Sequence, residues 1–149
     1  MGLIEGERTV EIEAPIDRCF DIAADIEGAP EWQGSLREVE VLEEDGDGRA
    51  ELVETESDAK VKTVKSRLRF SYFPDERIEW VQEKGETKSV NGWWDFEDLG
   101  GGRTRATYGL EVDTGRVLGM LVRGPVADQV RNFLLGGAAE GLKQKAEAG

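Results

Sequence analysis

The stretch VKSRLRFSY, residues 64–72, alternates apolar or small side chains with charged or polar ones. Neighbouring side chains of a strand point to opposite faces of a sheet, so this period of two predicts a strand with one buried face. The pattern extends in both directions, and strands are expected near residues 60–73, 76–84, 87–98 and 103–113. Short turn-forming segments such as Pro74-Asp75 separate them, and connections of this length join antiparallel neighbours.

The N-terminal part of the chain adds further elements to this sheet. Two strands are expected near residues 36–44 and 49–57, and a first strand over 9–13. Asp17 is the expected N-cap of a helix that continues to residue 25, after Ala14 and Pro15 have ended the first strand. Residues 26–32 predict a break followed by a second short helix or turn, which leaves Trp32 near its end.

The segment after the last strand changes to helical spacing. Its apolar side chains form one stripe: Leu118, Val122, Val126, Val130, Phe133, Leu134 and Leu142. Pro125 is expected to mark a start or a kink in this helix. Gly136, Gly137 and Gly141 each cost a helix up to ~1 kcal/mol relative to Ala. Either the sheet or a ligand approaches the helix closely at these positions, or the helix bends there.

The element order predicts an α+β fold in which the long terminal helix covers the apolar face of an antiparallel sheet. The chain has 149 residues, of which 38% are hydrophobic. This is enough for one domain and too few for two of ordinary size, so residues 1–149 are expected to form a single domain.

The period of two divides the last four strands into two sets of side chains. One set is aromatic, aliphatic or uncharged: Val64, Ser66, Leu68, Phe70, Tyr72, Ile78, Trp80, Gln82, Val90, Gly92, Trp94, Phe96, Ala106, Tyr108, Leu110 and Val112. The other set carries charges of both signs and is expected to face water. Trp93 falls on the water-facing side, where it is expected either to pack under a loop or to contact a partner. From the residues alone, a solid core is favoured over a cavity behind the apolar set.

Composition excludes several classes of function. The formal net charge is −13, and residues 1–60 alone carry −14, which argues against nucleic-acid binding because that affinity depends on cationic side chains. The chain has no histidine, and Cys19 is its only cysteine, so histidine-dependent nucleophiles, disulfides within the chain and most metal sites are excluded. Cys19 is interpreted as a core residue. No metal, no cofactor and no stable membrane insertion are expected, and the predicted location is the cytoplasm.

Six short motifs in order resemble the SRPBCC superfamily. These are VEIEAPID (10–17), FDIAADI (20–26), PEW (30–32), RIEW (77–80), GWWDF (92–96) and TRATY (104–108), followed by the terminal helix. The resemblance covers residues 7–147. The superfamily includes START-related lipid-transfer domains, birch-pollen-allergen-like proteins, bacterial polyketide cyclase/dehydrases and coenzyme-Q-binding proteins.

The resemblance implies a helix-grip fold, in which a curved seven-stranded sheet wraps the terminal helix and two short helices close one end. It also implies an open apolar pocket, which reverses the preference for a solid core. Carried over by position, the pocket residues are Trp32, Phe70, Tyr72, Trp80, Trp94, Phe96, Tyr108, Leu121, Val122 and Val126.

The expected function is therefore binding or transport of a hydrophobic small molecule, such as a lipid, an isoprenoid quinone or a polyketide-like aromatic. The expected oligomeric state is a monomer or a homodimer. A cyclase or dehydratase is the alternative, with Tyr72 and Tyr108 as proton donors, although the inward set offers no other acid–base group. A module that binds ribosomes or proteins is a third hypothesis.

Overall fold

A computed structural model describes residues 2–148, and it confirms the predicted order of elements as far as the last strand. The elements are β1 (Gly2–Ile12), α1 (Ile16–Ala24), η1 (Ile26–Glu31), β2 (Leu36–Glu44), β3 (Ala50–Asp58), β4 (Thr63–Phe73), β5 (Arg77–Gly85), β6 (Ser89–Gly100), β7 (Arg103–Thr114), α2 (Gly115–Leu121) and α3 (Pro125–Glu147). The short element η1 is a 3₁₀ helix.

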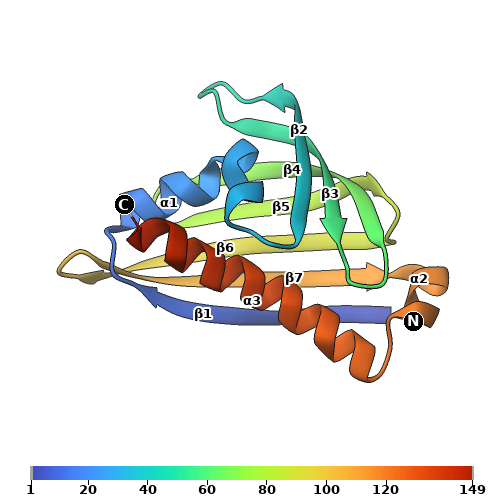
Figure 1. The fold of residues 1–149 in the computed structure, drawn as a ribbon. Helices are drawn as coiled ribbons and strands as arrows, with labels where there is room; N and C mark the ends of the chain where they lie inside the picture. Colours follow the sequence, from blue (N-terminus) through green and yellow to red (C-terminus); the bar gives the residue numbers. More distant parts are fainter. Residues whose placement is uncertain (1, 149) are drawn as a thin grey trace.

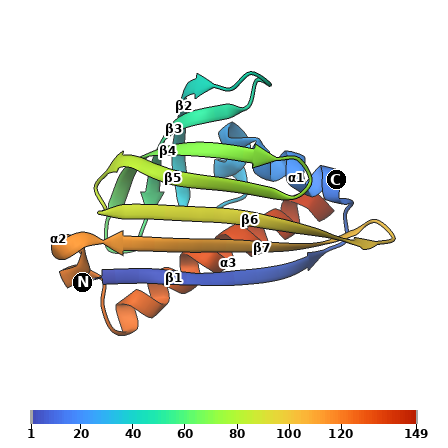
Figure 2. The ribbon, with the colours of Figure 1, turned by 180° about the vertical axis from the view of Figure 1, so that it is seen from behind.

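The seven strands form one antiparallel sheet in the order β1-β7-β6-β5-β4-β3-β2. The sheet curves around α3, which crosses its inner side, while α1 and η1 cover one end (Figure 1). The view from behind shows the outer face of the sheet, with α3 beyond it (Figure 2). This is the predicted helix-grip architecture. No helix within residues 2–148 combines the length and the apolar character needed to cross a membrane.

The two faces of the sheet differ as the alternation predicts. On the inner face, Phe70 lies opposite Trp80 and Trp94 lies opposite Tyr108, and all four side chains are buried. The outer face carries ion pairs between strands, such as Arg77 with Asp95 at 2.5 Å. Exposed pairs of this kind contribute little stability individually, so burial of the inner face supplies the main driving force.

Trp93 packs on the outer face of the sheet itself. Its indole N–H donates to the Glu7 carboxylate at 3.0 Å, and the Arg77 guanidinium lies 5.7 Å from the centre of its ring. The indole lies flat on Gly109 of β7, where a Cβ atom would overlap it. The contact depends on glycine in the neighbouring strand, which the sequence pattern of residues 87–98 does not reveal.

The first strand is longer than predicted, because it extends from Gly2 to Ile12 instead of covering only residues 9–13. The inward positions of its first half include Gly6 and Arg8, which break the apolar alternation. A Cβ atom at Gly6 would lie 3.0 Å from Cδ1 of Leu135, so α3 crosses β1 at this point. The helix occupies the space that an apolar strand residue would otherwise fill.

The prediction that Asp17 is the N-cap of α1 is wrong. The helix begins at Ile16 and its N-cap is Pro15, which makes no side-chain capping bond. Asp17 lies in the first turn, where a carboxylate still interacts favourably with the helix dipole. Cys19 on this helix is fully buried, and its thiol donates to the Ala14 carbonyl at 3.8 Å, which confirms that it is a core residue. Burial raises the pKa of this thiol.

The terminal stripe forms two helices instead of one. Pro125 is a start, because it opens α3, and Gly124 before it has a positive φ of 61° that interrupts the helical path. Leu118 and Val122 therefore belong to the short helix α2 and its C-cap, while Val130 belongs to α3. The break changes the direction of the apolar stripe and removes Leu121 from the inner side.

Candidate ligand-binding cavity

A cavity of about 150 Å³ lies between the inner face of the sheet and α3. Side chains from nearly every element reach it, including Ala23 of α1, Ile26 of η1, Leu68 of β4 and Leu134 of α3. None of the residues that line it is charged. The inner side is therefore hollow and not a solid core, as the resemblance implies.

Aromatic rings form one continuous wall of this cavity. The ring centres of Trp94 and Tyr108 are 4.8 Å apart, those of Trp80 and Tyr108 are 5.6 Å apart, and those of Phe70 and Trp80 are 5.4 Å apart. Trp32 extends the wall from the end of η1, with its ring centre 6.3 Å from that of Trp94. Such contacts are favourable beyond the burial of area, so the wall holds a defined shape.

Gly92 allows the Trp80 indole to lie against the backbone of β6. A Cβ atom at this position would overlap the indole ring. Trp80 lies directly opposite Gly92 in the strand pairing. Because Gly92 has no side chain, the indole can occupy the space next to the backbone of β6. The ring therefore lines the cavity and does not fill it.

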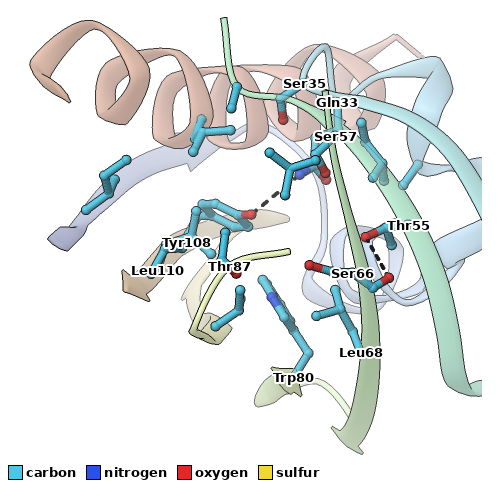
Figure 3. Close-up of a pocket in the computed structure, with 18 of the residues that line it drawn as sticks. Gln33, Ser35, Thr55, Ser57, Ser66, Leu68, Trp80, Thr87, Tyr108 and Leu110 are labelled. Atoms are coloured by element: carbon cyan, nitrogen blue, oxygen red, sulfur yellow. Dashed lines mark hydrogen bonds between the residues drawn. The ribbon is translucent and has the colours of Figure 1, made fainter. Parts of the chain in front are cut away.

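The Tyr108 hydroxyl and the Gln33 amide form a polar contact in the lining of the cavity (Figure 3). Gln33 Nε2 donates to the Tyr108 oxygen at 3.4 Å. Within residues 2–148, no acceptor takes the proton of this hydroxyl. A fully buried phenol that accepts a bond and donates none is unusual, since buried donors are nearly always paired. It can donate to an oxygen of a bound molecule.

Three further polar side chains, Ser66, Gln82 and Thr87, form hydrogen bonds with one another. The Ser66 hydroxyl donates to Gln82 Oε1 at 2.7 Å, and the Thr87 hydroxyl donates to the same oxygen at 3.1 Å. The Gln82 amide donates to the Thr87 carbonyl at 2.9 Å, which closes the group. Ser66 and Thr87 line the cavity, but these mutual bonds leave Tyr108 as the better donor for a ligand.

The structure brings together most of the residues predicted for the pocket. Those that line the cavity are Trp32, Phe70, Trp80, Trp94, Tyr108 and Val122. The sequence also missed several lining residues, among them Gln33, Ser35 and Ala29. These belong to η1 and the segment after it, where no periodic pattern marks which side chains point inward.

The remaining four predicted residues lie outside the cavity lining. The Tyr72 hydroxyl donates to the Ala50 carbonyl at 2.6 Å, so it is bound to the backbone of β3. Phe96 packs against Phe20, with ring centres 5.7 Å apart, in the solid part of the core. Val126 is half-buried near the start of α3, and Leu121 is 53% exposed on α2.

Alkaline pH is expected to destabilise the fold through the buried phenols. Burial raises the pKa of Tyr108 and of Tyr72 above the ordinary value of 10.0. Above about pH 10 the unfolded chain loses these protons while the folded chain keeps them, so the free energy of unfolding falls by up to ~1.4 kcal/mol per pH unit for each phenol. Urea unfolding at several alkaline pH values should show a smaller slope for Tyr108→Phe. An unchanged slope would contradict this assignment.

Residues 4–147 match the family model described as polyketide cyclase / dehydrase and lipid transport. The chain belongs to this family. The match includes at least part of every strand and helix, and it confirms the resemblance to the SRPBCC superfamily. No curated protein sequence matches the chain.

Solved structures share the fold of this family member at low sequence identity. A START superfamily protein from Mycobacterium smegmatis is 20% identical, with a TM-score of 0.82 and 97% of each chain covered. A protein from Thermus thermophilus is 21% identical, with a TM-score of 0.83 and 97% of each chain covered. An aromatase/cyclase named Zhui, from a Streptomyces species, is 20% identical, with a TM-score of 0.75 and 97% of this chain and 94% of that chain covered.

Proposed function

We propose that the protein binds an uncharged hydrophobic small molecule in this cavity and acts as a binding or carrier protein. The observation that carries the proposal is an uncharged, largely apolar lining with one buried phenol whose proton has no acceptor. A charged ligand would lose its hydration without gaining a partner. An apolar ligand with a carbonyl, ether or hydroxyl oxygen satisfies both features.

Burial of apolar surface supplies the affinity in this proposal. Each square ångström of apolar ligand surface removed from water contributes about 25 cal/mol. The hydrogen bond from Tyr108 adds orientation, because the Tyr108 ring is part of the aromatic wall, in contact with Trp80 and Trp94. A ligand ring stacked on this wall would direct its oxygen toward the Tyr108–Gln33 pair.

The volume of the cavity favours a ligand with one ring. An apolar protein cavity of ~150 Å³ accommodates benzene. The cavity of about 150 Å³ in this protein is of the same size. A lipid chain, an isoprenoid quinone or a polycyclic polyketide would need additional space, which the walls would have to supply by moving. We therefore expect single-ring ketones to bind without rearrangement and longer ligands to bind with it.

Gentle extraction of the purified protein followed by mass spectrometry tests the proposal directly. We expect an uncharged apolar compound at about one molecule per chain, or, from an empty preparation, saturable binding of acetophenone detected by quenching of tryptophan fluorescence. An empty protein that binds neither acetophenone nor ethylbenzene would overturn the proposal.

Replacing Tyr108 with phenylalanine should affect only ligands that accept a hydrogen bond. We expect the affinity for acetophenone to fall about fivefold, which corresponds to ~1 kcal/mol for one hydrogen bond. Ethylbenzene has a similar shape and no oxygen, so its affinity should stay unchanged. The matched control is Tyr72→Phe, which removes the bond to Ala50 outside the cavity and should leave both affinities unchanged. Equal losses for both ligands in Tyr108→Phe would contradict the role of its hydroxyl.

A cyclase or dehydratase activity is the second candidate, and the description of the family favours it. Tyr72 is bound to the Ala50 carbonyl, so Tyr108 alone would supply a proton within the cavity. Its raised pKa keeps it protonated near neutral pH, which suits hydrogen bonding to an enolate oxygen and does not suit a general base. Turnover of a tethered polyketide analogue that is lost in Tyr108→Phe and kept in Tyr72→Phe would support this candidate.

A further inference from the structure

Helix α2 is apolar on two sides. Leu118 and Val122 point inward and line the cavity. On the other side, Val117 is 77% exposed, Met120 is 65% exposed and Leu121 is 53% exposed. Single exposed apolar residues are normal, but three within five positions form a contiguous patch that water does not favour. We call these three side chains the α2 patch.

Cations flank the α2 patch on both sides along the sequence, in a chain whose net charge is −13. Arg116 and Arg123 flank the patch and are exposed, and no acidic residue lies between Asp113 and Asp128. The Asp113 carboxylate accepts the backbone N–H of Gly115 at 2.9 Å. Lys88 adds a third cation, since its Cβ lies 3.7 Å from the position of a Cβ at Gly115.

The acidic edge strand β2 lies away from this helix, whereas β1, which contacts α2, carries Glu5. Strand β2 carries Glu38, Glu40, Glu43 and Glu44, and it is the edge strand opposite to β1 in the sheet. Helix α2 follows β7 and lies at the other side of the molecule, next to the N-terminus (Figures 1 and 2). At physiological salt, charges more than about 8 Å apart are largely screened, so the glutamates of β2 have little effect on what the patch meets.

We infer that the α2 patch docks on an anionic lipid bilayer surface. Apolar side chains flanked by arginines are typical of segments that lie in the membrane interface, with the cations at the level of the phosphates. A second copy of the chain fits less well, because a stable dimer buries about 800 Å² on each partner and three side chains supply far less. Like charges would also face one another in such a dimer.

Docking would bring the bilayer within the thickness of one helix of the cavity. The α2 patch is on the outer side of α2, and Leu118 on the inner side lines the cavity. Gly115 and Gly124 lie at the two ends of the segment with φ values of 80° and 61°, which other residues rarely adopt. At these two glycines the chain changes direction abruptly, first between β7 and α2 and then between α2 and α3.

Co-sedimentation with vesicles of phosphatidylcholine and phosphatidylglycerol tests the inference, and it needs no cavity ligand. We expect the wild-type chain to bind, with affinity that rises with the fraction of phosphatidylglycerol. The triple variant Val117→Ser, Met120→Ser, Leu121→Ser should bind about tenfold more weakly or worse. Arg116→Gln with Arg123→Gln should remove the dependence on phosphatidylglycerol.

The matched control is Phe73→Ser with Val81→Ser, which removes two side chains of 47% and 46% exposure outside α2. This variant should bind vesicles as the wild type does, and unfolding in urea should show that all variants are folded. Failure of the wild type to bind, or equal binding by the triple variant, would overturn the inference. A wild-type dimer that the triple variant converts to a monomer would assign the patch to a second copy instead.

Discussion

Replacing Gly92 with alanine is expected to abolish the binding of single-ring ligands while leaving the protein folded. The new methyl group would occupy the space of the Trp80 indole, which lies flat on the glycine. The indole has to move away from β6, and the unfilled space beside it is the cavity. Overpacking of this kind costs ~1–3 kcal/mol, part of which the better strand propensity of alanine offsets. Acetophenone titration and urea unfolding measure the two effects.

Gly109→Ala is the matched control for this prediction, because the structure repeats the same contact on the outer face. Trp93 lies on Gly109 as Trp80 lies on Gly92, and the two pairs are neighbours across the β6–β7 register. We expect a comparable loss of stability and an unchanged affinity for acetophenone. Loss of binding in both variants would mean that disturbance of the sheet, and not occupation of the cavity, is responsible. Normal binding by Gly92→Ala would contradict the prediction.

The sequence predicted the sheet well because alternation is a local property. Each side chain from Val64 to Tyr72 is assigned to a face by its neighbours alone, and the structure confirms the split. The first half of β1 was missed because the inward positions of Gly6 and Arg8 are explained only by α3, which is distant in the sequence. The break before α3 was predicted only as a start or a kink at Pro125, because the apolar stripe continues through Gly124.

The cavity lining was predictable to the extent that strand positions determine it. Trp80, Trp94 and Tyr108 were assigned to the pocket from the alternation of side chains along each strand together with the family resemblance. All three line the cavity. Alternation shows which face of the sheet a side chain is on, but not how far along the strand the cavity extends. Tyr72 and Phe96 were therefore included among the predicted pocket residues, although they lie outside the cavity lining. Gln33, the polar partner of Tyr108, lies after η1 in a segment without periodicity, and only the tertiary structure reveals it.

The three glycines of α3 illustrate the same limit, because the sequence left close approach and a bend equally open. A Cβ atom at Gly141 would overlap the backbone oxygen of Trp32 and lie 3.0 Å from its carbonyl carbon. At Gly136 it would lie 3.1 Å from Nη1 of Arg8, and at Gly137 it would meet nothing within 4 Å. Close approach therefore applies to Gly141, where the end of η1 contacts the helix.

Among the glycine-to-alanine substitutions in α3, Gly141→Ala is accordingly expected to lower the free energy of unfolding most. Backbone atoms cannot move aside by changing a rotamer, so α3 and the end of η1 must separate, at a cost near the upper end of the ~1–3 kcal/mol typical of overpacking. The shift would also displace Gln33, which follows Trp32 and bonds Tyr108 at 3.4 Å. Urea unfolding should therefore show a lower midpoint, and acetophenone should bind more weakly.

Gly137→Ala provides the control on the same helix, since open space surrounds that position. Alanine is favoured over glycine within a helix by up to ~1 kcal/mol, so this variant should be more stable than the wild type. Gly136→Ala should fall between the two, because the end of the flexible Arg8 side chain can move aside. If Gly141→Ala were as stable as Gly137→Ala, the contact with Trp32 would not be the reason for glycine at position 141, and a bend would be the better explanation.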